Sequence, residues 1–290
     1  MGEYLCNLVV PGFPKSGTSS LHDFLDQHSD VCMSSPKESH YFAVTRQWEL
    51  GVDFHNSLFS HCKRQPQYYG ESSTIYCICQ ETAKRISEQL HKPKIILLLR
   101  DPVQRLISHY NWLYKLGLET RPILEAVESN GDNFHPDKPI PGSGNYMAYV
   151  TFSAYSVYVP MWTSVFGEGN VKLVFTNQLA ESPLQTVNEC FEFLGLSALS
   201  AIRDKRENKT SDARHMIRRK WAAGIEASIP QSLVNFAAKN ERLKRIWQQF
   251  ANEEVSIDPP GVTEREIAQI TKRLQREIDY FKSLSSITKA

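Results

Sequence analysis

The sequence predicts a three-layer α/β fold, in which helices flank a central parallel sheet, with a helical extension at the C-terminus. An apolar run at residues 8–10 passes through a glycine-punctuated turn into a helical pattern, and residues 95–99 form an unbroken run of aliphatic side chains. Short, continuous apolar runs are typical of parallel strands buried on both faces. We therefore expect one domain over residues 1–290, with a core at about 5–196 and a helical portion at about 197–290.

The composition is that of an ordinary globular protein that can bury a substantial core. Hydrophobic residues make up 41% and charged residues 22% of the 290 residues, and the net charge is +1. A charge this small supplies no global field for nucleic acid or an anionic membrane, so no nucleic-acid partner is expected and any anion site must be local.

The cysteines and the N-terminus bear on the compartment. The six cysteines show neither a C-x-x-C pair nor a disulfide framework, so free thiols are expected. The first strand begins within the first ten residues, and no apolar stretch is long enough to span a membrane. The sequence thus predicts a cytoplasmic protein without a transmembrane segment.

The first turn has the residues of a phosphate-binding loop. Its sequence, Gly12-Phe13-Pro14-Lys15-Ser16-Gly17-Thr18-Ser19-Ser20-Leu21, leads from the strand into a helix. The unpaired N–H groups and positive dipole end of a helix N-terminus attract anions. Additional donors come from the lysine and the hydroxyls, namely Lys15, Ser16, Thr18, Ser19 and Ser20.

This loop differs from the common nucleotide-binding sequence G-x-x-x-x-G-K-[ST] in the place of its lysine. Gly12 and Gly17 keep the glycine spacing, but Thr18 stands where the lysine is expected and Lys15 lies in mid-loop. In that common sequence the lysine precedes the hydroxyl that holds magnesium. We therefore expect the loop to bind phosphate-like groups without a metal, or, as the structural alternative, merely to link strand and helix.

A polar segment closed by aromatic residues, residues 35–42, follows the next short strand. If this segment is extended, Glu38 and His40 point to the same side. A glutamate one strand away from a phosphate loop is a candidate general base. The alternative is that Lys37 and Glu38 are surface charges.

The strand at residues 94–99 ends on a second candidate anion-binding residue, Arg100. Asp101 suits a helix N-cap and Pro102 the first helical position. Arg100 then lies at the carboxyl end of a strand, where open α/β sheets bind ligands, and Ser108 lies about two turns into the helix. Two alternatives are a structural arginine paired with a carboxylate, and a strand whose Asp101 holds magnesium; the capping role already explains Asp101.

Further elements follow the same patterns of apolar spacing and turn residues. We expect a strand that runs into a polar turn over 68–74 and a strand at 170–175. We also expect helices at 81–91, 120–130 and 183–194, a loop at 131–145, and a helix at 146–166 kinked or broken at Pro160. A mostly basic tract follows at 203–220, and then come two long helical patterns. The second begins with the capping box Thr263-x-x-Glu266 and carries an apolar stripe from Ile267 to Leu284 that is expected to pack on the core.

With these pieces placed, the chain resembles the sulfotransferases that use 3′-phosphoadenosine 5′-phosphosulfate (PAPS), in particular the heparan-sulfate-type branch and its bacterial relatives. Residues 12–21 resemble the family's 5′-phosphosulfate loop, and residues 98–110 its 3′-phosphate site. Residues 37–42 are similar to the segment that supplies the catalytic glutamate and a nearby histidine in the 3-O-sulfating enzymes. Residues 71–76 and 191–195 match two further family segments.

The resemblance implies sulfuryl transfer from PAPS to a hydroxyl of a carbohydrate, lipid or natural-product acceptor, with adenosine 3′,5′-bisphosphate as product and no metal. Glu38 would take the acceptor proton, and His40 would orient the acceptor or share that proton. The loop amides and Lys15 would hold the sulfuryl end of the donor. The implied nucleotide contacts further along the chain are Arg100 and Ser108 at the 3′-phosphate, and Lys209 and Arg214 closing over the nucleotide.

Two departures from the family pattern bear on the acceptor. Ser72 replaces a lysine that often follows the glutamate of the segment at 71–76, and Ala43 replaces an acidic residue. Catalysis would then rely more on Lys15 and His40, or the acceptor hydroxyl differs.

Three other functions compete with sulfuryl transfer. A P-loop small-molecule kinase would need a lysine next to Thr18, and a GTPase would need N-K-x-D, which residues 177–180 lack. The non-enzyme alternative is an inactive nucleotide-binding protein on the same fold, which the intact Lys15, Glu38, Arg100 and Ser108 disfavour.

Overall fold

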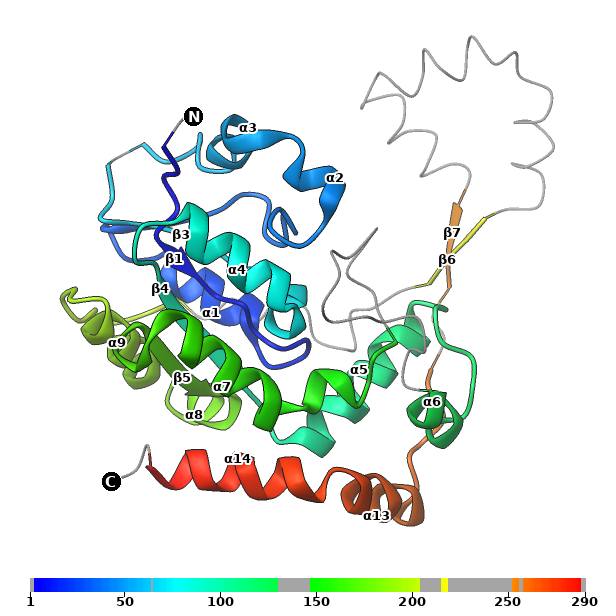
Figure 1. Cartoon of the computed structure of the whole chain (residues 1–290). Helices are drawn as coiled ribbons and strands as arrows, with labels where there is room; N and C mark the ends of the chain where they lie inside the picture. The colour runs from blue at the N-terminus through cyan, green and yellow to red at the C-terminus, as the bar shows by residue number, and fades with distance from the viewer. Residues whose placement is uncertain are drawn as a thin grey trace, which may run out of the picture. The chain divides into compact units, whose positions relative to one another are not determined.

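A parallel sheet lies at the centre of the larger compact unit, as predicted (Figure 1). In this computed structural model the sheet has the strand order β2-β3-β1-β4-β5 within the described residues, and every neighbouring pair is parallel. The strands are β1 (Leu8–Val9), β2 (Val31–Met33), β3 (Tyr68–Glu71), β4 (Lys94–Leu99) and β5 (Val171–Phe175). Because β1 lies between β3 and β4, the carboxyl ends of these three strands are neighbours.

The structure describes residues 3–63, 65–129, 147–203, 215–218, 252–255 and 258–287. The chain forms two compact units. The first comprises Met1–Tyr110, Pro122–Glu207 and Val262–Ala290, and the second comprises Asn111–Arg121 and Asn208–Gly261. The predicted loop at 131–145 and the candidate nucleotide contacts Lys209 and Arg214 lie outside the described residues.

Helices cover both faces of the sheet and produce the predicted three layers. Along β4, Ile95, Leu97 and Leu99 face one apolar core, and Ile96 and Leu98 face the other. The first core is shared with α4, α7 and the C-terminal helix, and the second with α1 and α9. The helices of the first unit, with α5 continuing into the second, are α1 (Thr18–Leu25), α2 (Thr45–Trp48), α3 (Gly51–Ser57), α4 (Gln80–Gln89), α5 (Pro102–Lys115), α6 (Ile123–Ser129), α7 (Tyr155–Phe166), α8 (Thr176–Glu181), α9 (Pro183–Phe193), α13 (Glu264–Arg273) and α14 (Gln275–Ile287).

Of the two C-terminal helices, α14 packs on the first core, as its part of the apolar stripe predicts, whereas α13 contacts α6 and α14. Thr263 and Glu266 form the predicted capping box at the start of α13, and α14 runs beside α7 (Figure 1). Glu277 of α14 accepts hydrogen bonds from the backbone N–H and hydroxyl of Ser156, both at 2.8 Å. Its carboxylate therefore caps the first turn of α7. Ile267, at the start of the stripe, is 37% exposed and is not part of the core.

Two expectations about secondary structure are corrected. The helix predicted over 146–166 begins only at Tyr155, and α7 continues through Pro160 to Phe166, so the alternative of a break at Pro160 is wrong. Within the basic tract, β6 (His215–Arg218) pairs antiparallel with β7 (Asn252–Val255), a hairpin that we did not predict. In the second unit, Lys115 at the end of α5 forms an ion pair with Asp258 at 3.4 Å.

The expectation of free thiols is wrong for two of the six cysteines. Cys32 of β2 and Cys62, which follows α3, form a disulfide across a sequence separation of 30 residues. The fold brings their Cα atoms to 6.2 Å, a distance that suits a disulfide. The remaining four, Cys6, Cys77, Cys79 and Cys190, are free and buried. Among the described residues no helix has the length and apolarity needed to cross a membrane.

Candidate active site

The predicted phosphate loop joins β1 to the N-terminus of α1. Gly17 is the helix N-cap with φ of 95°, and neither a capping side chain nor an acidic residue occupies the first turn of α1. A Cβ atom added to Gly12 would lie 2.0 Å from Cγ2 of Thr18, so a glycine is needed where the loop returns toward the helix. Because the helix N-terminus is not capped by a side chain, its N–H groups can bind an anion such as a phosphate or sulfate group.

Arg100 lies directly against this loop. Its Nη1 donates a hydrogen bond to the carbonyl of Lys15 at 3.0 Å, and burial lowers the pKa of its guanidinium below the usual range. No ion pair between Arg100 and a carboxylate occurs in the described part of the chain, so the structural alternative of a carboxylate partner finds no support. A half-buried cation without a carboxylate is stabilised when an anion binds.

Tyr155, which the sequence analysis did not single out, fixes the backbone of Arg100. Its hydroxyl donates to the carbonyl of Arg100 at 2.8 Å and accepts from the N–H of Arg100 at 3.4 Å. Its ring meets that of Phe13 in the loop at 4.7 Å between centroids. The stretch around Tyr155 is rich in aromatic residues, and nothing in its spacing distinguishes this one.

The helix after Arg100 begins as predicted. Oδ1 of Asp101 accepts hydrogen bonds from the N–H groups of Val103 and Gln104 at 3.1 and 2.9 Å, which is the geometry of an N-cap. Ser108 lies two turns along α5 and is half-buried. The adjacent His109 is 3% exposed, and burial followed by the charge of Arg105 lowers its pKa well below the usual value.

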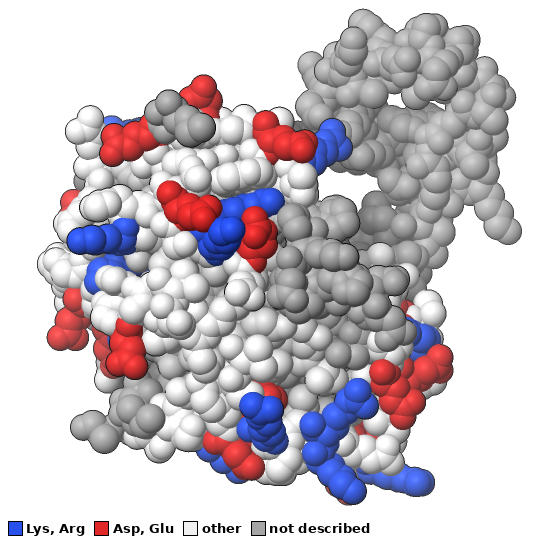
Figure 2. All heavy atoms as spheres, viewed as in Figure 1, with Lys and Arg blue, Asp and Glu red and all other residues white. Residues whose placement is uncertain are grey.

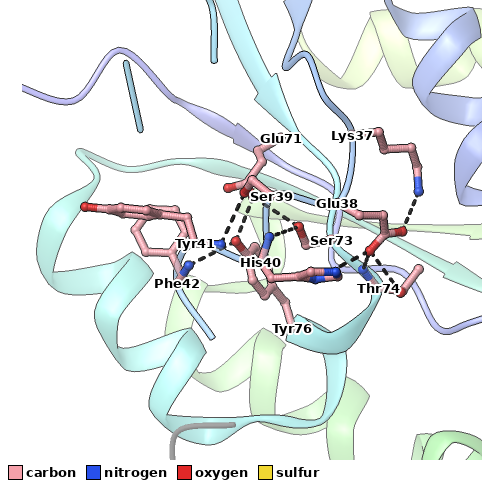
Figure 3. A network of polar contacts seen from close by, with 10 residues as sticks. All are labelled: Lys37, Glu38, Ser39, His40, Tyr41, Phe42, Glu71, Ser73, Thr74 and Tyr76. Carbon is pink, nitrogen blue, oxygen red and sulfur yellow. Dashed lines mark hydrogen bonds and ion pairs between the residues drawn. The ribbon is translucent and has the colours of Figure 1, made fainter. Parts of the chain in front are cut away.

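Glu38 and His40 lie side by side, although the segment that carries them is not extended (Figure 3). Their φ angles are 60° and 55°, so a turn brings Nδ1 of His40 to 3.8 Å from Oε2 of Glu38. The carboxylate of Glu38 also accepts hydrogen bonds from the backbone N–H of Thr74 at 2.8 Å and from the ammonium group of Lys37 at 2.5 Å. The prediction that both side chains point the same way holds, but the assumed strand conformation is wrong.

Hydrogen bonds through Ser72 connect the Glu38 segment to the helix of the phosphate loop. The N–H of Glu38 donates to the carbonyl of Ser72 at 3.0 Å, and the hydroxyl of Ser72 lies 3.0 Å from Nδ1 of His22 on α1. Ser72 directly follows β3, the neighbour of β1. The candidate base and the candidate phosphate loop therefore lie at the same edge of the sheet.

The buried imidazole of His22 predicts a loss of stability in acid. Burial, followed by the charge of Lys37, lowers the pKa of His22 to about 4, whereas an unfolded histidine titrates near 6.5. As the pH falls below 6.5, His22 becomes protonated in the unfolded chain but stays neutral in the folded chain until about pH 4. The free energy of unfolding therefore decreases between pH 6.5 and 4, and the full contribution of His22 is present above pH 6.5. Between pH 7 and 4.5 we expect His22 to account for a loss of about 2.4 kcal/mol in the free energy of unfolding.

Urea unfolding of the wild type and His22→Gln at both pH values measures this effect. The difference in unfolding free energy between the two proteins should narrow or reverse at pH 4.5. If the difference in unfolding free energy between the wild type and His22→Gln is the same at both pH values, the lowered pKa of His22 is contradicted.

The fold and the loop define a P-loop-type α/β protein with a candidate anion site at the carboxyl edge of its sheet. Residues 7–221 match the sulfotransferase domain family, and this chain belongs to that family. The predicted membership of the sulfotransferase family is thus confirmed.

Relatives of this chain carry the same family name. Human heparan sulfate glucosamine 3-O-sulfotransferase 3B1 is 26% identical over 208 residues, which are 72% of this chain and 50% of that protein. Membrane-associated sulfotransferase kil1 of Dictyostelium discoideum is 34% identical over 115 residues, 38% of this chain and 24% of that protein. The chain spans about half the length of the first of these relatives and about a quarter of the second.

A solved structure supports the same assignment over most of the chain. The sulfotransferase of Alicyclobacillus acidocaldarius superposes with a TM-score of 0.59 at 26% identity, and the match covers 83% of this chain and 95% of that one.

Proposed function

We propose that this protein transfers a sulfuryl group from PAPS to a hydroxyl group of a glycan acceptor. The observation that carries the proposal is the arrangement at one edge of the sheet. The phosphate loop follows β1, Arg100 follows the adjacent strand β4, and the Glu38 segment follows β2, which β3 separates from β1. Hydrogen bonds join Arg100 to the loop, and others through Ser72, directly after β3, join the Glu38 segment to the helix of the loop.

The residues at the loop fit the donor nucleotide. The N–H groups of Gly17, Thr18 and Ser19 at the start of α1, with the hydroxyls of Ser16 and Ser20, would bind the 5′-phosphosulfate. Lys15, which has φ of 68° in the loop, would balance the charge that develops on the leaving phosphate. When bound, PAPS supplies an activated sulfuryl group, so positioning and charge stabilisation are what the protein must add.

The other end of the nucleotide would lie against Arg100 and Ser108. Arg100 holds a half-buried positive charge beside the loop, and a guanidinium group can bind a phosphate with two hydrogen bonds. Ser108 on α5 would add a hydroxyl donor. This pair would distinguish the ribose 3′-phosphate of PAPS from nucleotides that lack it.

At the acceptor side, Glu38 would act as general base and His40 as its neighbour. The carboxylate of Glu38 is 28% exposed, so an acceptor hydroxyl can reach it. Burial lowers the pKa of His40, which keeps its imidazole neutral near pH 7 and able to orient a hydroxyl. His109 is buried beside Arg105 on the nucleotide side, and it does not compete for this role.

The acceptor class rests on the named relatives and on the surface charge. The human relative is named for glucosamine in heparan sulfate, which makes a glycan hydroxyl the first candidate. On the face seen in Figure 2, acidic and basic side chains are interspersed, in keeping with the net charge of +1. A glycan less anionic than heparan sulfate suits this surface.

The predicted cytoplasmic location stays a prediction, and the Cys32–Cys62 disulfide is more typical of oxidising compartments.

Nucleotide-dependent thermal stabilisation tests the choice of donor. Adenosine 3′,5′-bisphosphate should raise the Tm clearly, since a ligand at a hundredfold excess over its Kd adds about 2.7 kcal/mol to the folded state. ATP with magnesium should raise it much less, because the loop lacks the lysine next to Thr18. Equal or greater protection by ATP with magnesium would support the kinase alternative instead.

A further inference from the structure

A fully buried carboxylate, Glu71, lies behind the segment that carries Glu38, and the proposed function gives it no role. Glu71 is the last residue of β3 and is 0% exposed. Its Oε1 accepts hydrogen bonds from the hydroxyls of Ser73 at 3.1 Å, Tyr76 at 2.6 Å and Ser39. Its Oε2 lies 3.3 Å from Nε2 of the buried His55.

The three hydroxyls bound to Glu71 each hold a backbone amide of the same short segment (Figure 3). The N–H of His40 donates to Ser73 Oγ at 3.1 Å, the N–H of Tyr41 to Ser39 Oγ at 3.2 Å, and the N–H of Phe42 to Tyr76 Oη at 3.0 Å. Consecutive amides thus bind hydroxyl groups that all point their protons at one carboxylate oxygen.

The charge state of Glu71 fixes the direction of these hydrogen bonds. Burial alone would raise the pKa of Glu71, but the hydrogen bonds and charge of His55, with the hydroxyls of Ser39 and Tyr76, outweigh burial and the pKa is lowered. An ionised carboxylate only accepts hydrogen bonds. Each hydroxyl must therefore donate to Glu71, which leaves its oxygen lone pairs to accept from the amides.

The segment needs such support because its backbone is unfavourable. Glu38 and His40 have φ angles of 60° and 55°, in the left-handed region that residues other than glycine rarely adopt. Conformations of this kind persist when the surrounding contacts determine them. The amide bonds at residues 40–42 begin two residues after Glu38 and include His40 itself.

We propose that Glu71 is a positioning residue, whose carboxylate aligns the hydroxyls of Ser39, Ser73 and Tyr76 to hold the turn that presents Glu38 and His40 to the acceptor. The proposal rests on the role of Glu38 as general base. Glu71 touches neither donor nor acceptor and acts through the turn.

The hydroxyls of Ser39, Ser73 and Tyr76 that donate to Glu71 are called the relay hydroxyls. Removal of one relay hydroxyl tests the proposal and leaves the other hydrogen bonds to Glu71 in place. Loss of Glu71 itself would leave several buried donors without an acceptor and endanger folding. Ser73→Ala and Tyr76→Phe should each lower kcat about 10-fold, because small misplacements of a reacting group are costly, while the Kd for adenosine 3′,5′-bisphosphate stays unchanged.

Two matched controls remove hydroxyls that make no contact with Glu71. Ser34→Ala removes a buried serine hydroxyl that has no hydrogen-bond partner among the described residues. Tyr69→Phe removes a phenol hydroxyl from β3, the strand that ends at Glu71. Both controls should leave kcat and bisphosphate affinity as in the wild type, and control losses equal to those of the relay variants would overturn the proposal.

A double-mutant cycle with Glu38→Gln separates this inference from the proposed function. If the relay acts through Glu38, Ser73→Ala should lower kcat in the wild type but cause no further loss in Glu38→Gln. Suppose instead that Glu38→Gln lowers kcat, and that Ser73→Ala lowers kcat by the same factor in the Glu38→Gln background as in the wild type, or lowers it in neither. In both of these cases the positioning role is wrong, while the base role stands. If Glu38→Gln has wild-type kcat, the base role itself fails, and the positioning role with it.

Discussion

Glu38→Gln is expected to lower turnover by about 10²- to 10⁴-fold, the usual contribution of a general base. The substitution keeps the size of the side chain and an oxygen that can accept the N–H of Thr74, so the turn should survive. The affinity for adenosine 3′,5′-bisphosphate should not change, because the loop and Arg100 are untouched. Turnover against the acceptor and calorimetric titration of the nucleotide measure the two effects.

His40→Ala is the matched comparison for the base. Its imidazole lies beside Glu38 but need not accept the proton, so the loss of turnover should be smaller than in Glu38→Gln. Near-wild-type turnover in Glu38→Gln, together with a large loss in His40→Ala, would transfer the role of base to His40.

Arg100→Ala is expected to weaken binding of adenosine 3′,5′-bisphosphate by about 3 kcal/mol, roughly 100-fold, because a charge-assisted contact is lost. The natural control is a nucleotide without the 3′-phosphate, whose affinity should change little. Titration calorimetry with both ligands measures the difference. If both bind equally more weakly to the variant, Arg100 supports the loop through its bond to Lys15 and does not read the 3′-phosphate.

The phosphate loop and the position of Arg100 at the carboxyl edge of the sheet could be predicted, because each depends on residues that are close together in the sequence. The glycine spacing around Lys15 predicts the loop between β1 and α1, and Asp101-Pro102 predicts where α5 begins. Parallel pairing then brings Arg100 to the loop, since the carboxyl ends of neighbouring parallel strands meet at one edge. These predictions needed only short-range patterns and one rule of topology.

The features that the sequence did not reveal depend on contacts between distant residues. The relay at Glu71 joins side chains from residues 39–76, and no spacing rule indicates that three hydroxyls share one carboxylate oxygen. The Cys32–Cys62 disulfide depends on where α3 places its end, and Tyr155 reaches Arg100 only through the packing of α7. The left-handed conformations of Glu38 and His40 likewise follow from tertiary hydrogen bonds, because neither residue favours them.

Transfer of label from sulfur-labelled PAPS to a panel of glycan hydroxyl acceptors tests the central claim most directly. The wild type should label at least one acceptor and release one adenosine 3′,5′-bisphosphate for each sulfate transferred, with the rate unchanged by a metal chelator. Glu38→Gln should bind the nucleotide but label the acceptor at least about 100-fold more slowly. Bound PAPS that labels no hydroxyl, or phosphate transfer from ATP with magnesium to the same acceptors, would contradict it.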